Sequence, residues 1–117
     1  MTYSINLSDL DGSNGFRLDG VAKYDGLSSV STAGDVNGDG FDDLIVGASG
    51  ADSDGRSSGS SYVVFGKASG FSAAMNLSTL NGSNGFRLDG VASGDWLGWT
   101  VSTAGDVNGD GFDDLIV

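Results

Sequence analysis

Short apolar runs, separated by Gly-rich and Asp-rich connections, dominate the hydrophobic pattern of the chain. Residues 27–34 are rich in small and β-branched residues, and residues 44–48 form a continuous apolar run, as expected of a strand covered on both faces. Residues 62–65 form a third run, and residues 86–91 alternate between apolar and polar positions. We therefore predict four short strands, and a further strand at residues 16–21, which have the same sequence as the fourth.

The sequence repeats with a period of 70 to 71 residues. Residues 6–22 return with two changes as residues 76–92, and residues 31–46 return unchanged as residues 102–117. Four antiparallel strands at a period of this size predict an all-β fold built from β-propeller blades. A seven-stranded sandwich is the main alternative, but that fold would not require near-identical halves.

The repeat divides the chain into three parts. Residues 1–26 would supply the fourth strand of a preceding blade, residues 27–91 one complete blade, and residues 92–117 the first two strands of the next. About one and two-thirds repeats are present, so we expect a fragment of a longer propeller. Its open strand edges would favour contact with the remaining blades or self-association.

Composition and charge exclude several functions. The chain has no His, Cys or Pro, and its 16 acidic residues, all Asp, outnumber 5 Lys and Arg, for a formal charge of −11. Without His or Cys, a Cys/His zinc site, a disulfide and a Ser-His-Asp or Cys-His pair are excluded. The negative charge argues against a nucleic-acid partner, and no apolar run reaches the ~18 residues of a membrane span. We therefore expect a binding module, not an enzyme.

Two identical loops carry the candidate chemistry. The sequence Asp-Val-Asn-Gly-Asp-Gly-Phe-Asp-Asp occupies residues 35–43, the first Asp loop, and residues 106–114, the second Asp loop. Oxygen-bearing side chains at the first, third, fifth and ninth positions allow hard oxygens to converge, and Ca²⁺ prefers 6–8 such ligands. We predict two Ca²⁺ sites formed by these side chains and by the carbonyl at the seventh position: Asp35, Asn37, Asp39, Phe41 and Asp43 in the first, and Asp106, Asn108, Asp110, Phe112 and Asp114 in the second.

The loops have two other interpretations, an EF-hand and a metal-free turn. An EF-hand begins with the same residues but needs flanking helices and a carboxylate at the twelfth position, where this chain has Val46 and Val117. Solvated Asx-turns that hold a hairpin without metal remain the alternative. Mutual repulsion of three close carboxylates favours a bound cation. Strand alternation should direct Asp42 and Asp113, at the eighth position, away from the ion.

These segments resemble the FG-GAP repeat of integrin α-subunit propellers and their bacterial relatives. Besides the Asp loop, residues 65–66 match the FG element and residues 47–49 the GAP element, with Ser49 where the family usually has Pro. The resemblance implies a seven-bladed propeller with Ca²⁺ in the lower-face loops between strands one and two. It also implies that partners bind the opposite, upper face.

The upper face would carry three connections. By the strand order that the resemblance implies, these are residues 22–27, 49–60 and 92–99. They contain Tyr24, Trp96 and Trp99, and aromatic side chains on loops are good binding anchors. Alternatively, a Trp at a blade junction packs against the neighbouring blade. We predict an extracellular or cell-surface module that binds a protein or glycan, with structural Ca²⁺; the alternative is a non-catalytic accessory propeller of a larger secreted hydrolase.

Overall fold

The computed structural model describes residues 4–52 and 56–117. Within these ranges every regular element except two single turns of 3₁₀-helix is a strand, which confirms the predicted all-β class. In chain order the elements are η1 (Leu7–Asp9), β1 (Arg17–Asp19), β2 (Leu27–Gly34), β3 (Asp43–Ala48), β4 (Ser60–Val64), β5 (Ala74–Asn76), η2 (Leu77–Thr79), β6 (Gly85–Asp89), β7 (Ser102–Gly105) and β8 (Asp114–Ile116).

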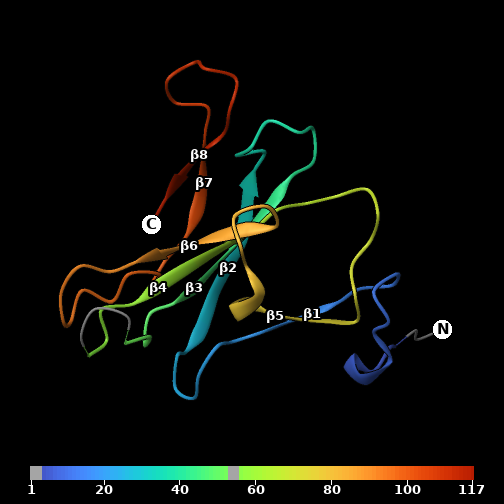
Figure 1. The fold of residues 1–117 in the computed structure, drawn as a ribbon, viewed down its shortest axis with the longest axis horizontal. Coiled ribbons are helices and arrows are strands. Elements are labelled where there is room, and N and C mark those ends of the chain that lie inside the picture. The colour runs from blue at the N-terminus through green and yellow to red at the C-terminus, as the bar shows by residue number, and fades with distance from the viewer. Residues whose placement is uncertain (1–3, 53–55) are drawn as a thin grey trace.

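One antiparallel sheet of four strands forms the centre of the molecule, in the order β2-β3-β4-β6 (Figure 1). Each strand therefore pairs with its predecessor in the sheet, as in a propeller blade. All four overlap the runs predicted from the sequence, although β4 begins earlier, at Ser60. It does so because Ser60 and Ser61 continue the antiparallel ladder opposite Asp89 and Leu88 of β6.

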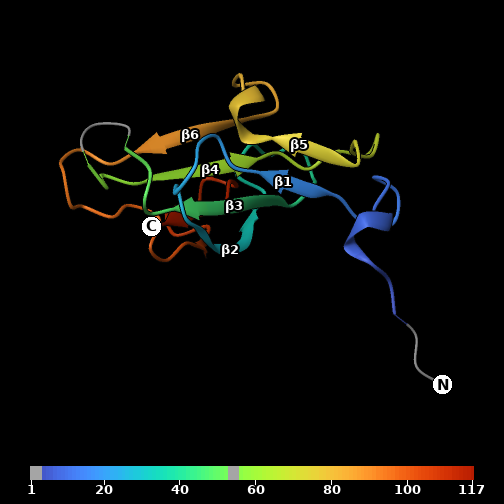
Figure 2. The same ribbon diagram turned by 90° about the horizontal axis from the view of Figure 1, so that it is seen from below.

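One face of this sheet is covered by chain segments that precede and follow β4. Val46, Tyr62 and Val64 point to this face, and the buried side chain of Leu77 from η2 packs there. Strands β1 and β5 also lie over it (Figure 2), contributing partly buried apolar side chains. They pair in parallel, a pairing that the sequence pattern did not predict.

The opposite face is covered by the C-terminal part of the chain. Ala33, Ile45 and Val63 are fully buried there, and Val101 and Leu115 pack against them. Strand alternation thus sends successive residues of β3 into two different apolar cores. This explains why its sequence is apolar without interruption, as predicted for a strand covered on both faces.

The repeated segment at the C-terminal end of the sequence folds into a second antiparallel pair, β7 and β8, with the same order and direction as β2 and β3. Burial differs between the two copies. Ile45 is 0% exposed, whereas its counterpart Ile116 is 60% exposed. Among the described residues, β8 pairs only with β7, so its other edge has no neighbouring strand. The proposed division of the chain at residues 26 and 91 remains a prediction.

The alternating strand directions place the connections at two opposite ends of the sheet. One end carries the first Asp loop and the connection from β4 to β6, with the second Asp loop projecting beside it (Figure 1). The other end carries the segments that precede β2, join β3 to β4 and follow β6. Residues 53–55 of the middle segment lie outside the described residues.

Candidate metal loops

The carboxylate of Asp35 organises the first Asp loop. Its Oδ1 accepts hydrogen bonds from the backbone N–H groups of Gly38 and Asp39 at 2.8 and 3.1 Å. Its Oδ2 accepts from the N–H of Gly40 at 2.8 Å. The chain can curl this tightly because Gly38 and Gly40 adopt positive φ angles of 76° and 88°. Three amides therefore converge on the carboxylate at the first position.

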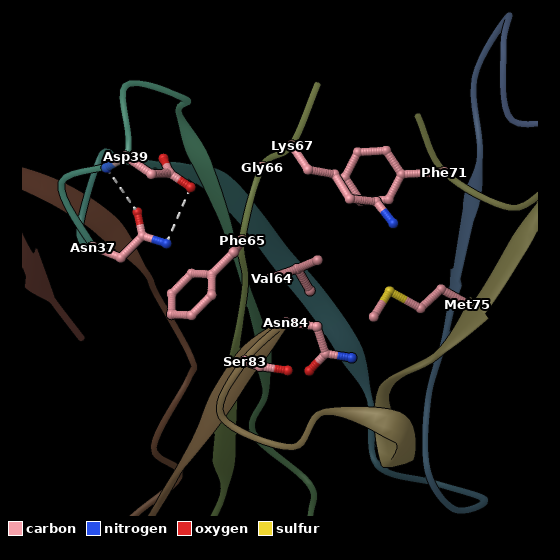
Figure 3. A pocket seen from close by; sticks show the side chains of 10 residues that line it. All are labelled: Asn37, Asp39, Val64, Phe65, Gly66, Lys67, Phe71, Met75, Ser83 and Asn84. Atoms are coloured by element: carbon pink, nitrogen blue, oxygen red, sulfur yellow. Dashed lines mark hydrogen bonds between the residues drawn. The ribbon is translucent and has the colours of Figure 1, made fainter. Parts of the chain in front are cut away.

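Hydrogen bonds also bring the third and fifth positions together. Asn37 Nδ2 donates to Asp39 Oδ2 at 3.3 Å, and the Asp39 N–H donates to Asn37 Oδ1 at 3.3 Å (Figure 3). The other oxygen of Asp39, Oδ1, accepts from the N–H of Phe41 at 2.9 Å. Asp35, Asn37 and Asp39 are therefore held in one small, exposed turn, with Asn37 and Asp39 on the wall of a cavity of about 250 Å³.

Asp43, at the ninth position, has a different environment. It is 0% exposed, its Oδ2 accepts from the N–H of Val36 at 2.9 Å, and its Oδ1 accepts from the N–H of Gly66 at 2.8 Å. Burial raises the pKa of Asp43, these two hydrogen bonds lower it, and the nearby charges of Asp39 and Asp35 raise it further. The net effect is a raised pKa, which means that the surroundings disfavour the ionised form of this carboxyl.

The second Asp loop repeats this arrangement. The carboxylate of Asp106 accepts from three backbone N–H groups, those of Gly109, Asp110 and Gly111, at 2.9, 3.1 and 2.9 Å. These bonds, the one from Gly111 foremost, hold the pKa of Asp106 below its usual value. Asn108 Oδ1 accepts from the Asp110 N–H at 3.3 Å, and Asp114 Oδ2 accepts from Val107 at 2.8 Å. The same nine-residue sequence thus adopts the same conformation in both loops.

The donor set fits Ca²⁺ in its chemistry, because it consists of carboxylate, amide and carbonyl oxygens. Within residues 4–52 and 56–117, however, no group of three or more acidic side chains is close enough to hold a metal ion. The predicted side-chain ligands instead accept hydrogen bonds from loop amides, as the Asx-turn interpretation expects. An ionised carboxylate offers about four acceptor positions, so the three bonds to Asp35 and the two to Asp43 leave further positions available.

The predicted partner-contact residues lie at the other end of the sheet and are exposed. Tyr24 is 93% exposed, Trp99 67% and Trp96 46%. The two Trp rings contact each other edge to face, with centroids 6.1 Å apart and planes at 89°. Whether these Trp side chains contact a partner or a neighbouring blade stays a prediction.

Backbone conformation distinguishes two of these aromatic residues. Tyr24 and Trp96 have φ angles of 66° and 57°, in the left-handed region. In the internal repeat, Tyr24 corresponds to Gly94 and Trp96 corresponds to Gly26. Both glycines also have positive φ, so each left-handed position holds glycine in one copy and an aromatic residue in the other.

The repeat, the four-stranded sheet and the conserved geometry of the two loops define a propeller-type repeat module. The FG-GAP repeat family model matches residues 27–64 and 97–117, half of the chain, and the chain therefore belongs to the FG-GAP repeat family. No curated protein matches the chain. FG-GAP repeats form integrin-α-like propeller modules that are generally non-catalytic and typical of extracellular or surface proteins. No helix in the described parts of the chain could cross a membrane.

Proposed function

We propose that the chain is a calcium-binding propeller module for adhesion or ligand binding outside the cell, in which Ca²⁺ is structural. The observation that carries the proposal is the doubled Asp loop, in which the same amide bonds hold the first-position carboxylate in both copies. Such bonds pre-organise oxygen ligands, which lowers the entropy lost when an ion binds.

The side chains at the first, third, fifth and ninth positions would hold the ion in each loop, together with the carbonyl of Phe41 or Phe112. Burial, and to a lesser extent the charges of Asp39 and Asp35, raise the pKa of Asp43. A divalent cation there would offset the repulsion among these three carboxylates. It would also link the end of β2 to the start of β3, because the loop joins these strands. Calcium would therefore stabilise the blade.

The partner, a protein or a glycan, would bind at the opposite end through the exposed aromatic residues. A non-glycine residue in the left-handed region costs roughly 1 kcal/mol. Tyr24 and Trp96 occupy such positions, whereas the other copy of the repeat has glycine there, which adopts this conformation without strain. The backbone conformation therefore does not account for an aromatic side chain at either position. Contact with a partner is a sufficient explanation, since aromatic rings supply much of the binding energy at interfaces.

Calcium titration of the 117-residue chain tests the metal proposal. We expect calorimetry to show two bound ions, because the two loops have the same sequence and the same hydrogen bonds. At an extracellular-type Kd of ~10⁻⁴ M and ~1 mM Ca²⁺, each site should contribute about 1.4 kcal/mol to the free energy of unfolding. The melting temperature should therefore be higher in excess Ca²⁺ than in excess chelator.

Matched variants identify the loop responsible for each ion. Asp39→Ala and Asp110→Ala should each remove one of the two ions, whereas Asp42→Ala, at the exposed eighth position of the first loop, should retain both. Equal melting temperatures of the wild-type chain in Ca²⁺ and in chelator would refute the structural role of calcium.

A further inference from the structure

The two Asp loops contact each other directly. The backbone N–H of Asp35 donates to Oδ2 of Asp113 at 2.8 Å, and the N–H of Asp113 donates to the carbonyl of Asp35 at 3.0 Å. Both backbone groups of Asp35 are therefore engaged by one residue that lies 78 positions away in the sequence. The side chain of Asp113 thus reaches the first Asp loop.

Close packing accompanies these bonds. At Gly34, which has a φ of 68°, an added Cβ would overlap the carboxylate of Asp113. At Gly38, an added Cβ would overlap the ring edge of Phe112. The equivalent of Gly34 in the other copy of the repeat is Gly105, which precedes the second Asp loop; it has a similar φ of 71° but no atom within 4 Å of such a Cβ. The same loop sequence is thus covered in one copy and open in the other.

We propose that Phe112 and Asp113 form a clasp that positions the first Asp loop. Asp113 fixes the backbone of Asp35 on both sides of its Cα, and Asp35 is the residue whose carboxylate gathers three loop amides. Order in the first loop therefore depends on the following repeat. Where calcium binds as proposed above, the affinity of the first loop depends on Asp113 as well; this last step rests on the proposed function.

The clasp has a direction. The second Asp loop contributes Phe112 and Asp113, its seventh and eighth positions, and the first Asp loop contributes Asp35, its first position. At the eighth position, Asp42 of the first loop is exposed, whereas Asp113 of the second loop is partly buried. Asp42 therefore provides a matched control for Asp113, with the same sequence neighbours but without the contact to another loop.

Residue-resolved amide hydrogen exchange of the full 117-residue chain, in chelator, tests the clasp. In Asp113→Ala we expect the amides of Asp35 and of residues 38–40 to exchange about tenfold faster, since a hydrogen bond to a charged acceptor contributes roughly 1.5 kcal/mol or more. Asp113→Asn, which keeps an acceptor oxygen, should restore most of the protection, and Asp42→Ala should leave it unchanged. Unchanged exchange in Asp113→Ala, or equal acceleration throughout the β2-β3-β4-β6 sheet, would overturn the proposal.

A second pair of variants displaces the clasp without altering Asp113. Gly34→Ala should reproduce the faster exchange of the first loop, because the new methyl group occupies the space of the Asp113 carboxylate. Gly105→Ala introduces the same backbone strain in open space and should leave the first loop protected. Equal protection of the first loop in both variants would contradict the clasp.

Calcium titration separates this proposal from the proposed function. In Asp113→Ala we expect one site to weaken about tenfold and the other to keep its affinity, while Asp42→Ala retains both. If the wild-type chain binds no calcium, the proposed function fails, and the exchange experiment still decides whether the clasp exists. If calcium binds but both affinities survive Asp113→Ala, the coupling of the clasp to the metal is refuted.

Discussion

Ile45→Ala should lower the free energy of unfolding by about 3 kcal/mol, as is typical when a fully buried aliphatic side chain is cut back to a methyl group. Ile45 lies on β3, paired opposite Ser31 of β2 and Val63 of β4, and is 0% exposed. Its side chain belongs to the core that joins the central sheet to β7 and β8. Urea unfolding followed by circular dichroism would measure the loss.

Ile116→Ala is the matched control, because Ile116 occupies the same place in an identical 16-residue segment. Its side chain is 60% exposed, so we expect a change of no more than about 0.5 kcal/mol. Similar losses in the two variants would show that the copies are equally buried, contrary to the structure. A small loss in both would mean that the central sheet is not the core.

The central sheet could be predicted from the sequence because the hydrophobic pattern and the internal repeat indicated the same strands. The uninterrupted apolar run of β3 indicated a strand covered on both faces, and β2 and β3 recur as β7 and β8. The pairing of β5 with β1 could not be predicted. Ala74–Asn76 has no strand-like run, and its pairing with Arg17–Asp19 depends on how both segments cover the sheet.

For the candidate site, the spacing of the oxygen-bearing residues singled out the two nine-residue loops, and their role as Ca²⁺ ligands stays a prediction. The pattern could not show that Asp43 also accepts an amide from Gly66, which lies 23 residues away. Nor could it show that Asp113 reaches Asp35, because that contact depends on how successive strand pairs stack.

Asp43→Ala, measured in chelator so that no metal contributes, should lower the free energy of unfolding by about 3 kcal/mol. The substitution leaves the N–H groups of Val36 and Gly66 without their acceptor, and an unsatisfied buried donor costs about 1–3 kcal/mol. Removing a carboxyl whose pKa is raised by burial and by Asp39 and Asp35 offsets part of this cost. Urea unfolding would again measure the result.

Asp114→Ala is the control, because Asp114 is the same residue of the second loop, is only partly buried and accepts one loop amide, that of Val107. We expect it to cost about 1 kcal/mol. If Asp43→Ala costs no more than Asp114→Ala, the bond to Gly66 does not hold the loop to the turn after β4.

Because Asp43→Ala is expected to destabilise the fold, a loss of calcium binding in this variant would combine two effects, the lost oxygen ligand and the weakened blade. Among the described residues, the side chains of Asp39 and Asp110 bond only within their own loops. They are therefore the positions at which metal binding can be tested separately from folding.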